Sequence, residues 1–247
     1  MRQILPTAAE VDVATAHAEA SRPSPRHRPW LMLNVVSSVD GATAVGGVSG
    51  PLGSAADRAV FSALRAVADV VLAGAGTVRA ERYRPPQTSD HHQSQRQARG
   101  QRTKPRVAVV SVSLDLDIEL DLFGDPQERP LVITTSDAPA DRLARLGEVS
   151  DLILAGTGRV DLSAALTTLS EHGSVVLCEG GSSLNGQLLA LDLVDEVNLT
   201  LSPVMAGGTS PRLAAAPVEV LRPLTLAHLW EAEGMLLARY IMDRDHP

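Results

Sequence analysis

The sequence predicts an α/β fold in which a mostly parallel central sheet is flanked by helices and ends in a C-terminal antiparallel hairpin. Short apolar runs alternate with segments of helical period along most of the chain, as in parallel sheets with crossover helices. Apolar residues make up 44% of the 247 residues but aromatic residues only 2%, which favours a Val, Leu and Ala core covered by helices on both faces. Two strand-like runs joined around Glu233-Gly234 predict the hairpin.

Composition limits the classes of function and the cell compartment. The net charge of −7 argues against a nucleic-acid partner, because binding to phosphate backbones needs a basic surface. The single cysteine, Cys178, excludes an intramolecular disulfide and lies in an apolar run, which suits a buried thiol in a reducing cytoplasm. No apolar run reaches the roughly 18 residues that a membrane helix needs. We therefore expect a soluble cytoplasmic protein without a membrane partner.

Residues 1–29 are expected to form an N-terminal extension to one domain that spans residues 30–247. Thr7 and Glu10 have the spacing of a capping box ahead of an Ala-rich segment, which predicts a short helix ending near Ala20. The Pro-rich residues 21–29 then interrupt regular structure.

The first core strand is expected over residues 30–39, which are largely apolar and β-branched toward the end. Asp40-Gly41 ends the strand, and a Gly-rich loop follows. Ser54 then provides an N-cap for a helix with apolar residues at helical spacing. Asp57 lies in the first turn of this helix. A purely structural explanation for an acid at this position is that its negative charge interacts favourably with the helix dipole.

A second core strand is expected over residues 69–73, and it leads into a glycine turn. Gly74 and Gly76 precede the hydroxyl of Thr77, and three arginines follow. These are Arg79, Arg82 and Arg84. A flexible turn next to guanidinium groups suits a phosphate, but a solvated basic turn explains the pattern equally well.

Residues 86–104 are polar, rich in Gln and Arg, and lack an apolar period, so a long flexible surface loop is expected there. His91-His92 lies within this segment. Adjacent histidines without carboxylate or cysteine ligands at suitable spacing do not make a metal site, and no metal is expected elsewhere in the chain.

The later elements continue the alternation, and ligands of such sheets bind beyond the carboxyl ends of the strands. Asp40, Gly74 and Glu179 all stand at such ends, so three turns are expected to converge on one edge of the sheet. The strands are expected at residues 106–112, 131–135, 149–154, 175–178, 195–202, 224–231 and 235–243, and the helices at residues 140–146 and 162–171.

Residues 174–186 read as a strand, a glycine turn and the start of a helix. The apolar run ends at Glu179, Gly180 and Gly181 follow, and Ser182 opens the helix. Such a turn leaves backbone N–H groups unpaired at the positive end of the helix dipole and lets an anion approach the main chain. A phosphate site is one interpretation, and a tight connection that binds nothing is the other.

Several segments together resemble one family, the pyrimidine reductases of riboflavin biosynthesis, which form the reductase domain of the bifunctional deaminase-reductase. The resemblance implies a dihydrofolate-reductase-like fold and a homodimer. It implies NADPH-dependent reduction of 5-amino-6-(5-phosphoribosylamino)uracil, or of the diaminopyrimidinone analogue, to the ribityl form. The segments are SSVDG at 37–41, LRA at 64–66, DVVLAGAGTVRAE at 69–81, CEGGSSLNG at 178–186, LVDEV at 193–197 and SPVMAGG at 202–208.

The same resemblance assigns roles by position. Ser49, Arg65 and Glu179 would face the substrate, with the guanidinium of Arg65 suited to a pair of phosphate oxygens. Val36 would lie against the nicotinamide of NADPH. The other residues assigned to the cofactor are Gly74, Gly76, Thr77, Glu81, Gly180, Gly181, Ser182, Ser183, Leu184 and Asn185.

The chain departs from the family pattern after Thr77, and this leaves the substrate open. The family tends to have two acidic residues and a proline where this chain has Glu81, Arg82 and Tyr83. The D-x-x-x-F spacing of Asp57 and Phe61 resembles dihydrofolate reductases, in which the acid anchors the pterin and helps to protonate it. Asp57 is therefore a candidate proton donor or substrate anchor, and a pterin or dihydrofolate reductase is the alternative function. A protein that binds a nucleotide or pterin without turnover is the second alternative.

Overall fold

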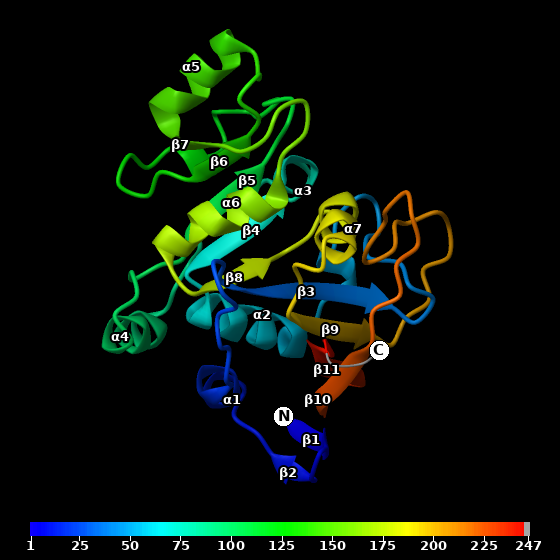
Figure 1. Ribbon diagram of the computed structural model, residues 1–247. Helices are drawn as coiled ribbons and strands as arrows, with labels where there is room; N and C mark the ends of the chain where they lie inside the picture. The colour runs from blue at the N-terminus through cyan, green and yellow to red at the C-terminus, as the bar shows by residue number, and fades with distance from the viewer. Residues whose placement is uncertain (245–247) are drawn as a thin grey trace.

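The computed structural model describes residues 1–244 and contains one eleven-stranded sheet with the strand order β2-β1-β10-β11-β9-β3-β8-β4-β5-β6-β7 (Figure 1). The strands are β1 (Arg2–Leu5), β2 (Ala9–Glu10), β3 (Trp30–Ser38), β4 (Val70–Gly74), β5 (Arg106–Val110), β6 (Leu131–Thr134), β7 (Asp151–Leu154), β8 (Val175–Cys178), β9 (Glu196–Ser202), β10 (Leu224–Ala232) and β11 (Met235–Met242). The helices are α1 (Val13–Glu19), α2 (Ala55–Val67), α3 (Ala75–Ala80), α4 (Asp90–Ala98), α5 (Ala140–Val149), α6 (Leu162–Leu169) and α7 (Ser182–Ala190), with short 3-10 turns at Gly50–Leu52, Asp121–Phe123 and Ser170–His172.

The sheet has a parallel part and an antiparallel part, as the alternation of elements predicted. From β9 to β7 every neighbouring pair is parallel. β9 then pairs antiparallel with β11, and β11 with β10 in the C-terminal hairpin. Glu233 and Gly234 turn the hairpin with φ values of 55° and 76°, the left-handed conformation that two-residue hairpin loops require.

Helices cover both faces of the parallel part, because its strands are apolar on both faces. Leu72 of β4 packs in a core with α6 and α7, whereas its neighbour Val71 packs on the other face with Val78 of α3 and Leu146 of α5. α2 covers the same face as α3, beside β3 and β8. Figure 1 shows α6 and α7 on one side of the strands and α2 on the other. This arrangement leaves the carboxyl ends of the parallel strands for a site.

The N-terminal segment is built into the sheet rather than appended to it. β1 pairs with β10, which extends the antiparallel edge. A helix ending near Ala20 was predicted and is present, but Asp12 is its N-cap, so the predicted capping box at Thr7 and Glu10 is wrong. Arg22 anchors the end of this segment by donating two hydrogen bonds, of 3.0 and 3.1 Å, to the buried Glu196 of β9.

The prediction of a loop without regular structure over residues 86–104 is wrong at its centre, where α4 forms. Ser89 caps this helix through its side chain. Arg96 is fully buried and donates hydrogen bonds to the carbonyl oxygens of Arg65, Ala66 and Ala68. These carbonyls end α2, and a guanidinium satisfies them well because it is a cationic donor at the negative end of the helix. No sequence pattern indicates this contact, since its acceptors are backbone atoms.

The predicted flexible turn after residues 69–73 is also different in the structure. Gly74 is the N-cap of α3, so Gly76 and Thr77 lie in a helix rather than in an open loop. Glu81 follows directly as the C-cap of this helix.

Within residues 1–244, no helix is long and apolar enough to cross a membrane. In the same part of the chain, no group of three or more histidine, cysteine or acidic side chains is arranged to hold a metal ion.

Candidate active site

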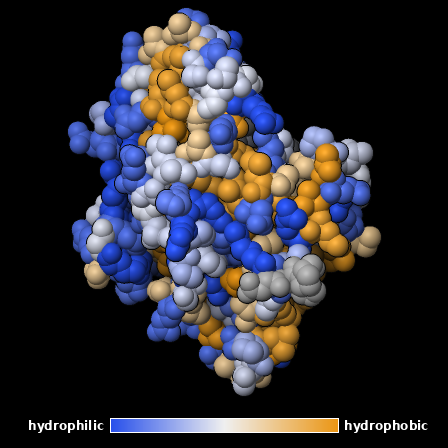
Figure 2. Space-filling model, viewed as in Figure 1, coloured by the Kyte–Doolittle hydropathy of each residue, from blue (hydrophilic) through white to orange (hydrophobic). Residues whose placement is uncertain are grey.

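A cleft of about 1000 Å³ opens at the carboxyl ends of the parallel strands and is bordered by α2, α3 and α7. Figure 2 shows the molecular outline indented near α3 and α7, between the upper part of the molecule and the loops on the right. Gly74 and Glu179 stand at strand ends and line this cleft, as predicted. Asp40 does not line it. Its carboxylate accepts hydrogen bonds from Ser38, Ala206 and Gly207, and these bonds lower its pKa to about 2.

Backbone groups form one end of the cleft, at the N-terminus of α7. Gly180 and Gly181 have φ values of 104° and 85°, which favour glycine. No side chain caps α7, so its first N–H groups point toward the cleft without a side-chain acceptor. A Cβ added to Gly181 would lie 3.4 Å from Oγ1 of Thr77, inside the space between the two helices. The turn therefore has the geometry by which helix N-termini in other proteins bind anionic groups.

Two side chains of this turn are already engaged. The hydroxyl of Ser182 donates to the carbonyl oxygen of Arg212 at 2.6 Å, and the amide of Asn185 donates to that of Leu213 at 2.9 Å. Both residues thus hold the loop after β9 against α7. Their side-chain donors are thus used within the protein, and the donors of this turn without a side-chain acceptor are the first N–H groups of α7.

Charged side chains form the other end of the cleft. Arg65 of α2 donates to both carboxylate oxygens of Glu179, from Nε to Oε1 at 2.6 Å and from Nη2 to Oε2 at 2.7 Å. Tyr83 donates its hydroxyl hydrogen to Oε2 at 2.6 Å. The ring of Phe61 lies under the guanidinium, 4.2 Å from its central carbon. Arg65 therefore meets a carboxylate with the paired nitrogens that were expected to hold a phosphate.

Burial and charge shift the pKa values of this network in a consistent way. Burial raises the pKa of Tyr83 well above its usual value, and the charge of Glu179 adds to the effect, so the hydroxyl stays a donor. Burial alone would lower the pKa of Arg65, but Glu179 outweighs it and raises the pKa. Burial also raises the pKa of the neighbouring thiol of Cys178 to about 12, so this thiol is not a nucleophile.

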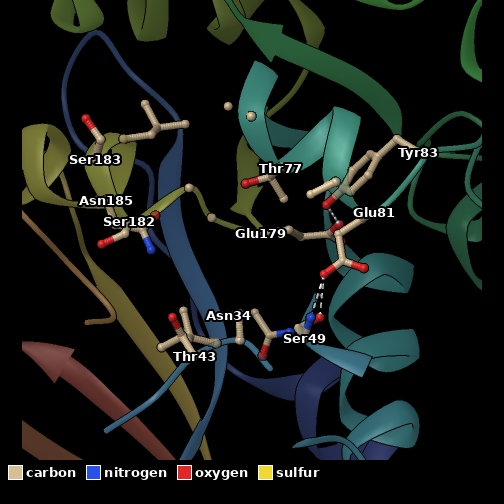
Figure 3. Close-up of a pocket in the computed structure, with 18 of the residues that line it drawn as sticks. Asn34, Thr43, Ser49, Thr77, Glu81, Tyr83, Glu179, Ser182, Ser183 and Asn185 are labelled. Carbon is tan, nitrogen blue, oxygen red and sulfur yellow. Dashed lines mark hydrogen bonds between the residues drawn. The ribbon is translucent and has the colours of Figure 1, made fainter. Parts of the chain in front are cut away.

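Ser49 and Glu81 meet across the cleft. Glu81 accepts hydrogen bonds from both the backbone N–H and the hydroxyl of Ser49, at 2.8 and 2.9 Å. Figure 3 shows this contact beside the pair of Tyr83 and Glu179, with Ser182, Ser183 and Asn185 on the opposite side of the cleft. The contact fixes the end of the Gly-rich loop after β3 against α3.

Asp57 lines the cleft near the same end as Arg65. Burial raises the pKa of its carboxyl group, while the hydroxyl of Thr200 and the charge of Arg58 act in the opposite direction. Ser54 caps α2 as predicted, and Asp57 lies in the first turn of this helix. Asp57 is therefore placed both to interact with the helix dipole and to contact a ligand in the cleft.

Every residue that the sequence assigned to the site lines this one cleft. They are Val36, Ser49, Asp57, Arg65, Gly74, Gly76, Thr77, Glu179 and Glu81, together with Gly180, Gly181, Ser182, Ser183, Leu184 and Asn185.

Sequence reasoning missed other polar residues of the site. Tyr83 was noted only as a departure from a pattern, and Thr200 only as part of a strand. Asn34 and Arg159 line the cleft with Tyr83, whereas Thr200 lies outside its lining, beside Asp57. The position of Thr200 near the carboxyl end of a strand was the one available signal. Nothing in the sequence indicated that its hydroxyl meets Asp57.

Similar proteins are named as reductases. The 2,5-diamino-6-ribosylamino-4(3H)-pyrimidinone 5′-phosphate reductase of Methanothermobacter thermautotrophicus is 32% identical over 187 residues, which is 75% of this chain and 82% of that protein. The reductase of the same name from Archaeoglobus fulgidus is 29% identical over 73% of this chain and 83% of its own length.

Solved structures support the fold. A pyrimidine reductase-like protein from Corynebacterium diphtheriae superposes with a TM-score of 0.85 at 28% identity, over 95% of this chain and 100% of that one. The riboflavin biosynthesis reductase Rib7 of Saccharomyces cerevisiae has the same fold, with a TM-score of 0.66 at 16% identity over 90% of this chain and 93% of that one. The predicted dihydrofolate-reductase-like α/β class is thereby confirmed. The model of the RibD C-terminal domain matches residues 29–236, and the chain belongs to this family.

Proposed function

We propose that this protein is an NADPH-dependent reductase that converts a ribosylamino-pyrimidine 5′-phosphate to its ribityl form in riboflavin biosynthesis. One observation carries the proposal: a single cleft joins a backbone anion cradle at the N-terminus of α7 to a polar wall that includes Asp57, Arg65 and Glu179. The cradle suits the pyrophosphate of a dinucleotide, and the polar wall suits a pyrimidine with a phosphorylated sugar. The names of the relatives supply the same substrate class.

The residues at the α7 end fit a dinucleotide. Gly180 and Gly181 leave room that a side chain would fill, and the N–H groups of α7 face that room. The hydroxyl of Thr77 lies close by. Arg159 lines the outer part of the same cleft and provides a cation for a further phosphate. The assignment of NADPH rather than NADH rests on the family resemblance.

When bound, the reduced nicotinamide supplies a hydride to the first carbon of the open-chain sugar imine. A protonated imine is already electrophilic, so the protein needs no nucleophile at this step. Val36 of β3 gives the nicotinamide an apolar surface in the cleft. Arg65 binds Glu179 through Nε and Nη2, and its third nitrogen, Nη1, is the donor that would meet a phosphate oxygen of the substrate.

The test is oxidation of NADPH that depends on added substrate. Purified protein is mixed with NADPH and, in separate reactions, with the ribosylamino-pyrimidine phosphate, with dihydrofolate or with neither, and the loss of NADPH absorbance is followed. Fast oxidation with the pyrimidine alone supports the proposal. Oxidation with dihydrofolate alone contradicts it, and the absence of oxidation with either favours a binding protein without turnover.

A pterin or dihydrofolate reductase is the second candidate, and the position of Asp57 favours it. The carboxyl group lies in the cleft, Thr200 is beside it, and burial raises its pKa, which brings proton exchange with a heteroaromatic ring within reach. The Asp57→Asn variant separates the two candidates. Loss of dihydrofolate reduction in this variant supports a pterin enzyme with Asp57 as anchor or proton donor.

Two further expectations remain proposals. The homodimer rests on the family resemblance, and the reducing cytoplasm rests on the single buried cysteine, Cys178. Light scattering coupled to gel filtration measures the first, and a mass equal to that of one chain at micromolar concentration would contradict it.

A further inference from the structure

Tyr83 anchors the ion pair at the α2 end of the cleft to a third part of the chain. Its hydroxyl donates to Oε2 of Glu179 at 2.6 Å, the oxygen that also accepts from Nη2 of Arg65 at 2.7 Å. Oε1 of Glu179 accepts from Nε of Arg65 at 2.6 Å. The two bonds between Arg65 and Glu179 would let both side chains turn together, whereas the bond from Tyr83 fixes the carboxylate against the segment after α3.

The backbone turns sharply to bring Tyr83 to this place. Arg82 has a φ of 47°, a left-handed conformation that strains a residue with a Cβ and that is common at functional sites. The N–H of Tyr83 then donates to the carbonyl oxygen of Val78 in α3 at 3.1 Å. Tyr83 is 9% exposed and packs in the core with Val71 and Phe123, so its position does not follow a mobile ligand.

Arg65 needs such an anchor, because it is a long side chain at the edge of an open cleft. Its side chain is 20% exposed, whereas that of Glu179 is 3% exposed. The ring of Phe61 covers the guanidinium at 4.2 Å, and Glu179 takes the Nε and Nη2 side, which leaves Nη1 for a ligand. A guanidinium that is already held in place loses less conformational entropy when it binds a phosphate.

We propose that Tyr83 is a positioning residue that acts through Glu179 to hold Arg65 toward the phosphate of the substrate, so that the enzyme selects the 5′-phosphate over the dephosphorylated compound. This inference rests on the proposed function and adds a residue to that same site. The family tends to have a proline at this position, and proline has no hydroxyl to donate. Burial and the charge of Glu179 raise the pKa of Tyr83, so its hydroxyl remains a donor to Glu179.

The Tyr83→Phe variant tests the inference because it removes the hydroxyl and keeps the ring in the core. We compare kcat and KM for the ribosylamino-pyrimidine 5′-phosphate and for the same compound without its phosphate. The KM for the phosphate is expected to rise about 10-fold with little change in kcat, as for the loss of one hydrogen bond to a charged group. The dephosphorylated compound is expected to keep its wild-type kcat/KM.

Tyr240→Phe is the matched control. Tyr240 is the other tyrosine of the chain and lies in β11, and it is not among the residues that line the cleft. This variant also loses one phenol hydroxyl, so it is expected to keep the wild-type kcat and KM for both compounds.

A second measurement needs neither a variant at Tyr83 nor turnover, and it decides if Tyr83→Phe does not fold. Both tyrosines are replaced by fluorotyrosine, and Tyr240→Phe assigns the remaining fluorine NMR signal to Tyr83. Ribose 5-phosphate and ribose are then added as probes. The Tyr83 signal is expected to move with ribose 5-phosphate alone, because a phosphate on Arg65 changes the charge that the phenol meets at Glu179.

The outcomes separate the inference from the proposed function. Equal losses of kcat/KM for the two compounds, or no loss for either, overturn the inference while the reductase stands. A Tyr83 signal that ribose 5-phosphate leaves unmoved overturns it as well. If the wild type reduces neither pyrimidine but the signal moves with ribose 5-phosphate and not with ribose, the proposed function fails and the positioning of Arg65 by Tyr83 stands.

Discussion

The two ends of the cleft present different kinds of chemical group to a ligand. At the α7 end the proposed binding groups are backbone N–H groups of the first turn of α7, which follows Gly180 and Gly181 in conformations that favour glycine. At the α2 end they are side chains, and the central unit is the ion pair of Arg65 and Glu179 with the hydroxyl of Tyr83. The α7 end depends on the path of the chain at one turn, whereas the α2 end depends on partners far apart in sequence.

This difference predicts which changes each end tolerates. A backbone cradle survives many side-chain changes but not the addition of a Cβ at its closest point. A buried ion pair tolerates no loss of one partner, because the other charge is left without compensation. The three variants below probe these two sensitivities and the support behind the α2 end.

The largest effect is expected from Arg65→Met. It removes the cation from Glu179, whose side chain is 3% exposed, and leaves a buried, unpaired carboxylate that still accepts a hydrogen bond from the hydroxyl of Tyr83. Loss of one partner of a buried pair costs about 3–5 kcal/mol, so the free energy of unfolding in urea should fall by about 3 kcal/mol. The pyrimidine reductase activity should be lost as well.

Arg102→Met is the control for this variant. Arg102 pairs with Glu128, but its side chain is 55% exposed. Exposed pairs contribute about 0–1 kcal/mol, so this variant should be nearly neutral. Equal losses of stability in the two variants would contradict the claim that burial makes the ion pair of Arg65 and Glu179 more important for stability than an exposed pair.

A smaller effect on stability, but a specific one on the cofactor, is expected from Gly181→Ala. The φ of 85° strains any residue with a Cβ, at about 1–2 kcal/mol. The new methyl group would also lie 3.4 Å from Oγ1 of Thr77, in the proposed pyrophosphate cradle. The Kd for NADPH, measured by fluorescence titration, should rise by at least 10-fold.

Gly208→Ala isolates the strain from the loss of space. Gly208 has a φ of 73°, but a Cβ there would meet no atom within 4 Å. A similar loss of stability with unchanged NADPH affinity is expected. If both variants weaken NADPH binding equally, the α7 turn is not the cradle.

The smallest effect on stability is expected from His17 of α1, the helix that packs against α2. The ring of His17 packs edge-on against Trp230 and contacts Arg22, which forms an ion pair with Glu196 of β9. Burial lowers the pKa of His17 to about 3. The unfolded chain binds this proton near pH 6.5, so the histidine contributes stability that is present above that pH and is lost as the pH falls toward 3. In His17→Phe, the decrease in the free energy of unfolding between pH 6.5 and pH 4 should be smaller than in wild type.

An unchanged slope in His17→Phe would mean that this ring is protonated in the folded protein.

The same difference between the two ends explains which parts of the cleft could be predicted from the sequence. The strand, glycine turn and helix start at residues 175–182 were predictable because an apolar run, two glycines and a serine follow one another, and the strand ends that carry Gly74 and Glu179 follow from the parallel sheet. The hydrogen-bond partners at the α2 end could not be predicted from the sequence. Arg65 and Glu179 are 114 positions apart, and Tyr83 and Glu179 are 96 apart, so their contact is a property of packing. α4 was missed for the same reason, because Arg96 is buried on backbone carbonyls that carry no sequence signal.

The most direct test of the account is the fate of the transferred hydrogen. Wild-type protein is given the diaminopyrimidinone phosphate and NADPH deuterated in the transferred position at C4 of the nicotinamide ring, and the product is analysed by mass spectrometry and NMR. If the one cleft holds both ligands, a single deuterium appears at the first carbon of the ribityl chain. A ribityl product without deuterium, or consumption of the cofactor without a ribityl product, would contradict the account.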